Sequence, residues 1–232
     1  MKLVIENLKK SFGLNHVLKG LNFSFEEGKI YALLGRNGAG KTTFFNCVNE
    51  DLEVDYGSFY IEENGNKKKI ASEDLGYVLS SPTVPDFLTG REFIKFFIDI
   101  NKDRIKDLKS IDEYFDMMKI DVKDRDKLLK DYSHGMKNKM QMLANIISDA
   151  KILLLDEPLT SLDVVVAEEM KNLLKSLKEN KILIFSTHIM ELALSLCDEI
   201  VLLKDGVFEY VDKGNLSDEE IKNKILDALK EE

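Results

Sequence analysis

One segment of the sequence has the residue types and spacing of a phosphate-binding loop. Residues 35–42, Gly-Arg-Asn-Gly-Ala-Gly-Lys-Thr, match the pattern G-x-x-x-x-G-K-[ST] directly after an apolar run and before a stretch, 43–48, that favours a helix. Glycines let backbone N–H groups converge on phosphate oxygens, and the N-terminus of a helix adds a partial positive charge. We expect Lys41 to reach the outer phosphates and the Thr42 hydroxyl to bind Mg²⁺. The segment therefore predicts a nucleotide site.

A second segment ends in two successive carboxylates. The apolar run 152–155 is followed by Asp156 and Glu157, and then by Pro158. Side chains alternate along a strand, so the two carboxylates diverge unless the strand ends there, as the proline indicates. Together with the phosphate loop, this pair predicts that Asp156 holds the magnesium shell. Glu157 is then expected to orient or deprotonate the water that attacks the γ-phosphate.

The first third of the chain has the patterns of β-strands. Apolar or alternating runs occupy residues 3–5, 21–25 and 30–34, and we expect them to be strands of one sheet. Another alternating run, 58–62, is followed by Asn64-Gly65, a pair that tolerates the backbone conformation of a tight hairpin turn. The N-terminal part is therefore predicted to be β-rich.

The middle of the chain, about residues 86–147, changes to a helical period. Capping signals predict helix starts at Thr89, Ser110 and Ser133. The first of these helices would place three aromatic side chains on one face: Phe93, Phe96 and Phe97. Basic and acidic residues balance between 101 and 131, so we interpret this lysine-rich region as solvated helix faces and not as a nucleic-acid patch.

The last third predicts a parallel sheet. Apolar runs at 152–155, 182–185 and 200–203 are separated by helical stretches, and strands alternating with helices form parallel sheets that are covered on both faces. The first of these helical stretches has an apolar stripe at Met170, Leu173, Leu174 and Leu177. A capping box at 217–220 predicts the start of a final helix.

Composition sets wider limits. The chain has 232 residues and a formal net charge of −9, which weakens any nucleic-acid function and suits one domain, with or without an insertion. The sequence has neither an apolar stretch long enough for a membrane span nor a signal peptide, so we expect a cytoplasmic protein. The two cysteines, Cys47 and Cys197, have no metal-site spacing and are expected to be buried thiols.

Two further fragments complete a set of motifs. Residues 132–136, Tyr-Ser-His-Gly-Met, precede a helical stretch, and residues 186–188, Ser-Thr-His, end an apolar run. With these, the sequence resembles the ATP-binding subunits of ABC transporters over nearly its whole length. Residues 132–136 look like the signature motif, 152–157 like the Walker B strand and 161–163 like the D-loop. The segment that looks like the Walker A loop consists of Gly35, Arg36, Asn37, Gly38, Ala39, Gly40, Lys41, Thr42 and Thr43.

The resemblance implies a fold: an α/β P-loop NTPase of ABC type, with a mixed sheet core, an N-terminal antiparallel β part and an inserted helical subdomain. Residues 1–232 would form one ABC ATPase domain. Its core would comprise about 1–85 and 150–232 and contain the nucleotide site, and the helical subdomain, about 86–149, would carry the signature motif.

The resemblance also implies ligands and partners. ATP and Mg²⁺ would be the cofactors, Phe12 would stack on adenine, and His188 would contact the γ-phosphate. Ser133 and Gly135 would donate to the γ-phosphate held by another subunit, in a homodimer or a pseudo-symmetric heterodimer. The permease would be a separate multi-span polypeptide, with this chain on the cytoplasmic face of the cell membrane. The Asp163 carboxylate could in addition cap the helix that follows it.

Two positions depart from the pattern of the family. His134 replaces the second glycine of the signature motif, and Ser80 stands where the family places a Gln or Glu that links magnesium and the attacking water to the transmembrane partner. Ser80 or Ser81 could still offer a hydroxyl ligand through water, but with a shorter reach, so we predict slow or partner-dependent hydrolysis. The uncharged segment 75–85, with Phe87-Leu88, could dock a helix of the permease or could pack under a loop.

Three functions fit these observations to different degrees. The leading hypothesis is the ATPase subunit of an exporter for peptides, antibiotics or lipid-like substrates. A soluble ABC-type ATPase acting in translation or DNA repair is the alternative, although such relatives usually carry two ATPase units or a long coiled-coil insertion. A GTP-binding switch is disfavoured because the sequence has no N-K-x-D motif: candidates such as Asn66, Asn101, Asn138 and Asn223 lack Asp at the fourth position.

Overall fold

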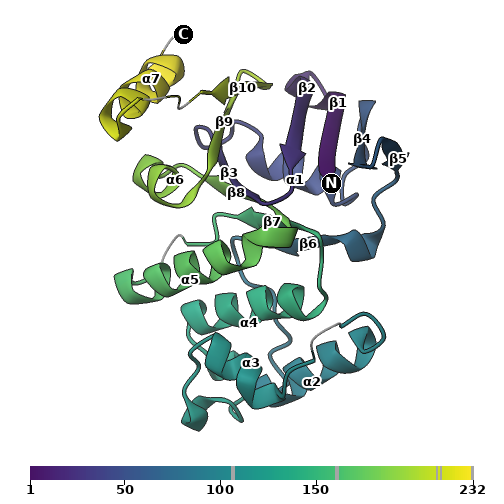
Figure 1. Ribbon diagram of the computed structural model, residues 1–232, viewed down its shortest axis with the longest axis vertical. Coiled ribbons are helices and arrows are strands. Elements are labelled where there is room, and N and C mark those ends of the chain that lie inside the picture. Colours follow the sequence, from purple (N-terminus) through teal and green to yellow (C-terminus); the bar gives the residue numbers. More distant parts are fainter. Residues whose placement is uncertain (106–107, 160–161, 213, 215, 231–232) are drawn as a thin grey trace.

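The strands form two sheets in the computed structural model, which describes residues 1–105, 108–159, 162–212, 214 and 216–230 (Figure 1). A four-stranded antiparallel sheet has the order β2-β1-β4-β5, and a six-stranded sheet has the order β10-β9-β3-β8-β7-β6. The first comprises β1 (Lys2–Phe12), β2 (Asn15–Glu26), β4 (Tyr56–Glu63) and β5 (Asn66–Lys68). The second comprises β3 (Lys29–Leu34), β6 (Leu75–Val78), β7 (Ile152–Asp156), β8 (Ile182–Thr187), β9 (Glu199–Lys204) and β10 (Val207–Val211).

The assignment of the early strands to one sheet was wrong for β3. This strand lies in the six-stranded sheet, parallel to β8 on one side and to β9 on the other. Its residues from Ile30 to Leu34 are all buried, which suits the centre of a sheet covered on both faces. Strands β6 to β9 and β3 run parallel, and β10 is antiparallel to β9, so the expected mixed core and the N-terminal antiparallel part are both confirmed.

Helix α1 (Lys41–Val48) lies between the two sheets. Its Phe44 and Phe45 are fully buried, together with Leu3 and Phe25 of the four-stranded sheet and Leu154 of the six-stranded sheet. This cluster forms the first of two hydrophobic cores. It anchors the helix that follows the phosphate loop against both sheets.

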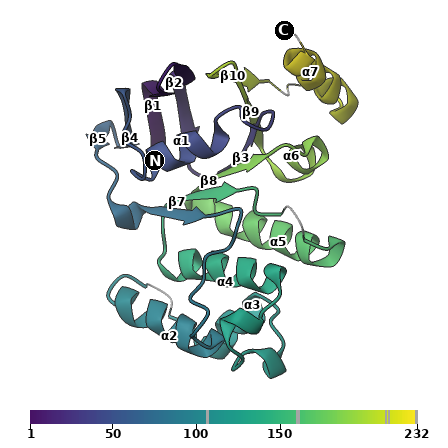
Figure 2. The same ribbon diagram turned by 180° about the vertical axis from the view of Figure 1, so that it is seen from behind.

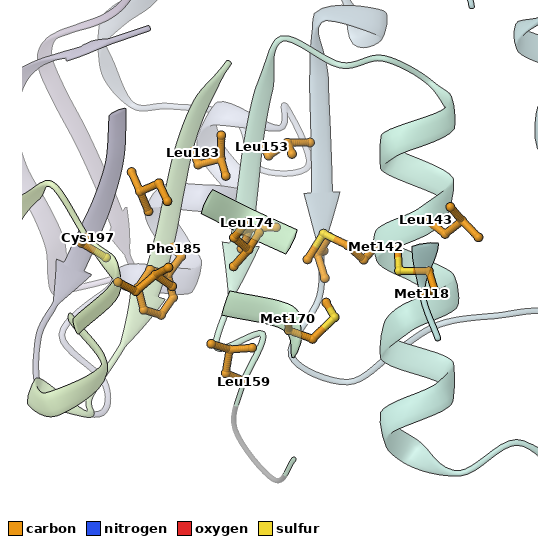
Figure 3. Close-up of a cluster of buried hydrophobic side chains, with 14 of the residues drawn as sticks. Met118, Met142, Leu143, Leu153, Leu159, Met170, Leu174, Leu183, Phe185 and Cys197 are labelled. Atoms are coloured by element: carbon orange, nitrogen blue, oxygen red, sulfur yellow. The ribbon is translucent and has the colours of Figure 1, made fainter. Parts of the chain in front are cut away.

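The other helices pack against the opposite face of the six-stranded sheet or extend beyond it (Figure 2). They are α2 (Gly90–Asn101), α3 (Ile111–Met117), α4 (His134–Ile147), α5 (Val164–Leu177), α6 (Met190–Leu196) and α7 (Asp218–Lys230), with 3₁₀ turns at Ser72–Asp74, Val122–Asp124, Leu129–Asp131 and Lys178–Asn180. The second core lies between these helices and the sheet, where Leu174 of α5 and Met142 of α4 approach Leu153 and Phe185 (Figure 3).

Side-chain alternation divides each central strand between the two cores. On β7, Ile152 and Leu154 belong to the core that contains α1, and Leu153 and Leu155 belong to the other. Continuing the alternation places Asp156, the last residue of β7, on the α1 side. Helix α1, which follows the predicted phosphate loop, and Asp156 therefore share one face of the sheet.

The predicted helix starts are confirmed. Thr89 and Ser110 form capping boxes with acids three residues later, and Ser133 accepts a hydrogen bond from the backbone N–H of Met136. Ser217 likewise pairs with Glu220 at the start of α7. The Asn64-Gly65 turn joins β4 to β5, with φ of 53° and 79°. These signals depend on neighbouring residues only, which explains why they could be predicted.

The three aromatic side chains predicted for one face of α2 differ in burial. Phe93 is buried and Phe97 partly buried, with ring centroids 4.9 Å apart, but Phe96 is 51% exposed. Residues three and four apart share a helix face, and the Phe96 ring lies 5.5 Å from that of Phe97, so the core covers only part of the aromatic face.

Helices α2, α3 and α4 lie together at one end of the molecule, below the six-stranded sheet in Figure 1. We retain the division into a core and a helical subdomain as a prediction. Both cysteines are buried, as expected. Within the described part of the chain, no helix is both long enough and apolar enough to cross a membrane.

Candidate active site

The phosphate loop connects β3 to α1 and depends on glycine for its shape. Gly40 precedes the first residue of α1 with φ of 106°, a conformation that side chains disfavour. A Cβ atom at Gly40 would lie 2.8 Å from Cγ1 of Val17. The loop also closes on itself, since the Ala39 N–H donates to the carbonyl of Arg36. The helix begins at Lys41, two residues earlier than the stretch expected from sequence.

Lys41 is 6% exposed and points back into the loop. Its Nζ donates to the carbonyl oxygens of Gly35, at 2.8 Å, and Arg36, at 3.2 Å. Burial lowers the pKa of the Lys41 ammonium, and the carboxylates of Glu157 and Asp156 oppose this shift. A phosphate group could replace the two carbonyls as the hydrogen-bond acceptor and would be a stronger partner because it is charged.

Asp156 is held by two hydroxyl groups. Its Oδ2 accepts a hydrogen bond from Thr42 Oγ1 at 2.8 Å, and its Oδ1 accepts one from Ser186 Oγ at 2.5 Å. The register of β7 and β8 places Asp156 directly beside Ser186. A carboxylate and a hydroxyl at hydrogen-bond distance are hard oxygen donors of the kind that Mg²⁺ binds, so Thr42 and Asp156 fit that ion.

Glu157 lies just beyond the end of β7, where the chain turns. Its φ is 48°, and its N–H donates to Ser186 Oγ at 3.1 Å. Its carboxylate is 3.0 Å from Nδ1 of His188, which follows β8. The strand ends at Asp156, as Pro158 indicated, and the turn that follows brings the Glu157 carboxylate within hydrogen-bond distance of His188.

A cavity of about 330 Å³ joins several of these groups. Its wall includes Phe12 and Glu157. The predicted loop contributes Asn37, Gly38, Gly40, Lys41, Thr42 and Thr43. Arg36 and Ala39 lie in the same loop but line a neighbouring hollow together with Leu229. Phe12 is 48% exposed at the end of β1, so its ring is available to a ligand in the cavity.

The signature residues are not brought to this cavity. Ser133 and Gly135 lie at the start of α4, and neither lines the hollow around Lys41. His134 is exposed beside them, and Ser80 is exposed after β6. Of the predicted D-loop, Ser161 lies outside the described residues, and Asp163 caps α5 through hydrogen bonds from Val165 and Val166 N–H.

Comparison with known proteins agrees with this geometry. A model of the ABC transporter family matches residues 18–160, more than half of the chain. The chain belongs to the ABC transporter family. An uncharacterized ABC transporter ATP-binding protein of Methanocaldococcus jannaschii is 34% identical over 238 residues, covering 95% of this ABC subunit and 87% of the relative. The chain is thus an ATP-binding subunit with the ATPase domain of this family.

One further sequence relative and one solved structure are also similar to this chain. An Fe(3+) ions import ATP-binding protein of Fusobacterium nucleatum is 27% identical, and the match covers 91% of this ABC subunit but 58% of that protein. A solved ATP-binding cassette in a dimeric post-hydrolysis state, bound to ADP and phosphate, superimposes with a TM-score of 0.75 at 22% identity, covering 90% of this chain and 99% of that one. At that identity the likeness concerns the fold.

Sequence reasoning gave no role to Ser186 or Tyr77 in this ABC subunit. Ser186 is fully buried and contacts both Asp156 and Glu157, and Tyr77 donates through its hydroxyl to Asn46 Oδ1 on α1 at 3.0 Å. For Ser186, the available signal was its place as a polar residue directly after the apolar run 182–185. The Tyr77 contact depends on how the edge strand packs against α1, which no local pattern reveals.

Proposed function

We propose that this chain binds ATP with Mg²⁺ at the phosphate loop and hydrolyses it through Glu157. The observation that supports this most directly is the convergence of Lys41, Asp156 and Glu157 on one edge of the parallel sheet, where the electrostatic influence of both carboxylates reaches Lys41. Lys41 and the loop N–H groups would hold the phosphates, and Thr42 and Asp156 would hold the metal. The bound ion would neutralise phosphate charge.

Glu157 and His188 have different roles in this proposal. The Glu157 carboxylate accepts a proton from the attacking water, and its 3.0 Å contact with His188 orients it. His188 contacts the γ-phosphate in the same proposal, since its side chain is 41% exposed beside the cavity wall. Phe12 stacks on the adenine ring.

Two copies, or this chain and a related one, enclose the nucleotide between them. Ser133 and Gly135 support this part of the proposal because they are accessible at the N-terminus of α4 yet lie outside the cavity of their own chain. The N-terminus of a helix favours an anion, so α4 of one subunit suits the γ-phosphate on the other. The pair would be two-fold or pseudo-two-fold.

The motion of this dimer drives a separate multi-span permease, with the chain on the cytoplasmic face of the membrane. On the resemblance to compact exporter subunits, we propose export of a peptide, antibiotic or lipid-like substrate. Vesicles that contain the permease and this subunit would distinguish export from import by the side on which substrate accumulates. Import, which the name of the Fusobacterium relative describes for that protein, is the other outcome of this test.

The substitution Glu157→Gln tests the catalytic part. It should lower ATP hydrolysis by about 10²- to 10⁴-fold, the scale of general base catalysis, and leave ATP binding intact. With Mg-ATP, light scattering should show a dimer that Mg-ADP does not produce. Glu168→Gln is the control, since Glu168 is exposed on α5 and forms an ion pair with the neighbouring Lys171 at 2.9 Å. Unchanged hydrolysis in the Glu157 variant would contradict the proposal.

A further inference from the structure

The aromatic ring of Phe12 has a cation over it. Nζ of Lys10 lies 5.6 Å from the ring centroid. Phe12 lines the cavity around Lys41, whereas Lys10 does not. A cation within about 6 Å of an aromatic face is attracted to it. Lys10 therefore contacts the ring without lining the cavity itself.

Lys10 is itself held by a residue from a distant part of the chain. Its ammonium forms an ion pair with Asp55 at 3.0 Å, and its side chain is 14% exposed. The hydrogen bond from Lys10 is the main cause that keeps the pKa of Asp55 below its usual range, against a smaller opposing effect of burial. Asp55 therefore remains ionised and paired at neutral pH.

Asp55 also contacts the backbone next to Phe12. Its second carboxylate oxygen accepts a hydrogen bond from the N–H of Ser11 at 2.7 Å, and its own N–H donates to the carbonyl of Lys9 at 3.0 Å. On the other side of the same strand end, the Ser11 hydroxyl is 2.8 Å from Nδ1 of His16 on β2. The three residues before Phe12 are therefore all tied down.

We propose that Lys10 and Asp55 are positioning residues for the nucleotide base, holding Phe12 so that the face turned away from Lys10 stacks on it. This rests on the proposed binding of ATP with Phe12 against adenine. The ammonium polarises the ring and limits its rotation, and the ion pair with Asp55 keeps the ammonium in place. Because the ring is fixed before the nucleotide arrives, less conformational freedom is lost on binding.

The test compares two ligands that differ in the base. Dissociation constants are measured for Mg-ATP and for magnesium tripolyphosphate, which has the phosphates and no base. Lys10→Met and Asp55→Asn should each weaken Mg-ATP binding by about 3- to 10-fold and leave tripolyphosphate binding unchanged. Lys9→Met is the matched control, since Lys9 neighbours Lys10 but lies over Tyr56, at 5.4 Å. It should change neither constant.

The other outcomes are also decisive. If Lys10→Met weakens both ligands equally, Lys10 acts through its charge on the phosphates, and the positioning role is overturned. Phe12→Leu separates this failure from failure of the stacking role. If Phe12→Leu weakens ATP binding but Lys10→Met and Asp55→Asn do not, the stacking role stands and the positioning by Lys10 and Asp55 is rejected. Unchanged ATP binding in Phe12→Leu would overturn both. Retained tripolyphosphate binding reports an intact phosphate loop in every variant.

Discussion

The Ser186 hydroxyl donates to Asp156 at 2.5 Å and accepts the N–H of Glu157 at 3.1 Å. The two hydrogen bonds join the carboxylate proposed to hold the metal to the backbone of the residue proposed as the base. Ser186 and Asp156 lie opposite each other at the ends of β8 and β7, and both are buried. One side chain thus contacts two acidic residues for which different tasks are proposed.

Removing this hydroxyl should impair catalysis more than binding. Ser186→Ala leaves two buried polar groups with one partner fewer, at a cost of about 1–3 kcal/mol in the free energy of unfolding. Since contacts that orient metal ligands typically change activity by about 10- to 100-fold, we expect kcat to fall within that range and the Mg²⁺ requirement to rise. Steady-state ATPase rates over a magnesium titration measure both.

Ser176→Ala is the control for this substitution. Ser176 also donates its hydroxyl, at 2.7 Å, but to the Leu173 carbonyl on α5. Its variant should retain the wild-type rate and magnesium dependence. Equal losses in the two variants would mean that Ser186 acts through general stability and not through Asp156.

Replacing Ser80 should raise the basal rate. Ser80 is exposed after β6, and the resemblance to the family would place a Gln or Glu, which have longer side chains, at about this position. Ser80→Gln would restore a group that can reach the attacking water, and one added hydrogen bond in the transition state corresponds to about tenfold in rate. The ATPase rate of the isolated chain is the measurement. Ser81→Gln makes the same change one residue on and should have no effect, so similar gains in both variants would reject the role assigned to position 80.

Two glycines of the phosphate loop should differ in their tolerance of alanine. Gly38 and Gly40 both have left-handed φ, of 83° and 106°. A Cβ at Gly38 meets nothing within 4 Å, whereas one at Gly40 meets Val17 at 2.8 Å and Leu18 at 3.1 Å. Gly38→Ala should cost about 1–2 kcal/mol from backbone strain alone, and Gly40→Ala a further 1–3 kcal/mol, roughly, from crowding.

Urea unfolding measures this difference between the glycine variants. The midpoint for Gly40→Ala should lie clearly below that for Gly38→Ala, with the same dependence on urea concentration. Equal midpoints would show that the loop relaxes around the added methyl group.

The helices α2 and α3 should lose stability in acid through Asp112. Arg91 and Arg125 each donate to its carboxylate at 3.0 Å, and these hydrogen bonds, with that of Arg91 the larger cause, hold the pKa of Asp112 below its usual range. Because the folded pKa is lower than the unfolded value of about 3.9, this stabilisation is present above that pH and is lost as the pH falls through the folded pKa.

Thermal unfolding at several pH values tests the sign. Asp112→Asn should lower Tm at pH 7, and its difference from wild type should shrink as the pH falls below about 4. Asp121→Asn is the control, because Asp121 is 72% exposed and lies 3.5 Å from Lys123. A Tm difference for Asp112→Asn that stays constant with pH would exclude the ion pairs as its cause.

The sequence by itself determined the features that depend on neighbouring residues. The phosphate loop ending in Lys41 and Thr42, the acids that follow β7 and the caps at Thr89 and Ser133 were all recognised from local patterns. Each of these uses hydrogen bonds or backbone conformations within a few residues, so the residue types carry the information. The roles proposed for them in catalysis remain predictions.

Only the tertiary structure decided how distant segments meet. It assigned β3 to the six-stranded sheet, turned Phe96 toward solvent, set Ser186 opposite Asp156 and brought Asp55 to Lys10. These relationships follow from strand register and from which faces the two cores bury, and a shift of one residue in the register of β7 and β8 would separate Ser186 from Asp156. The energy that selects the register comes from packing across the whole sheet, which no short pattern in the sequence contains.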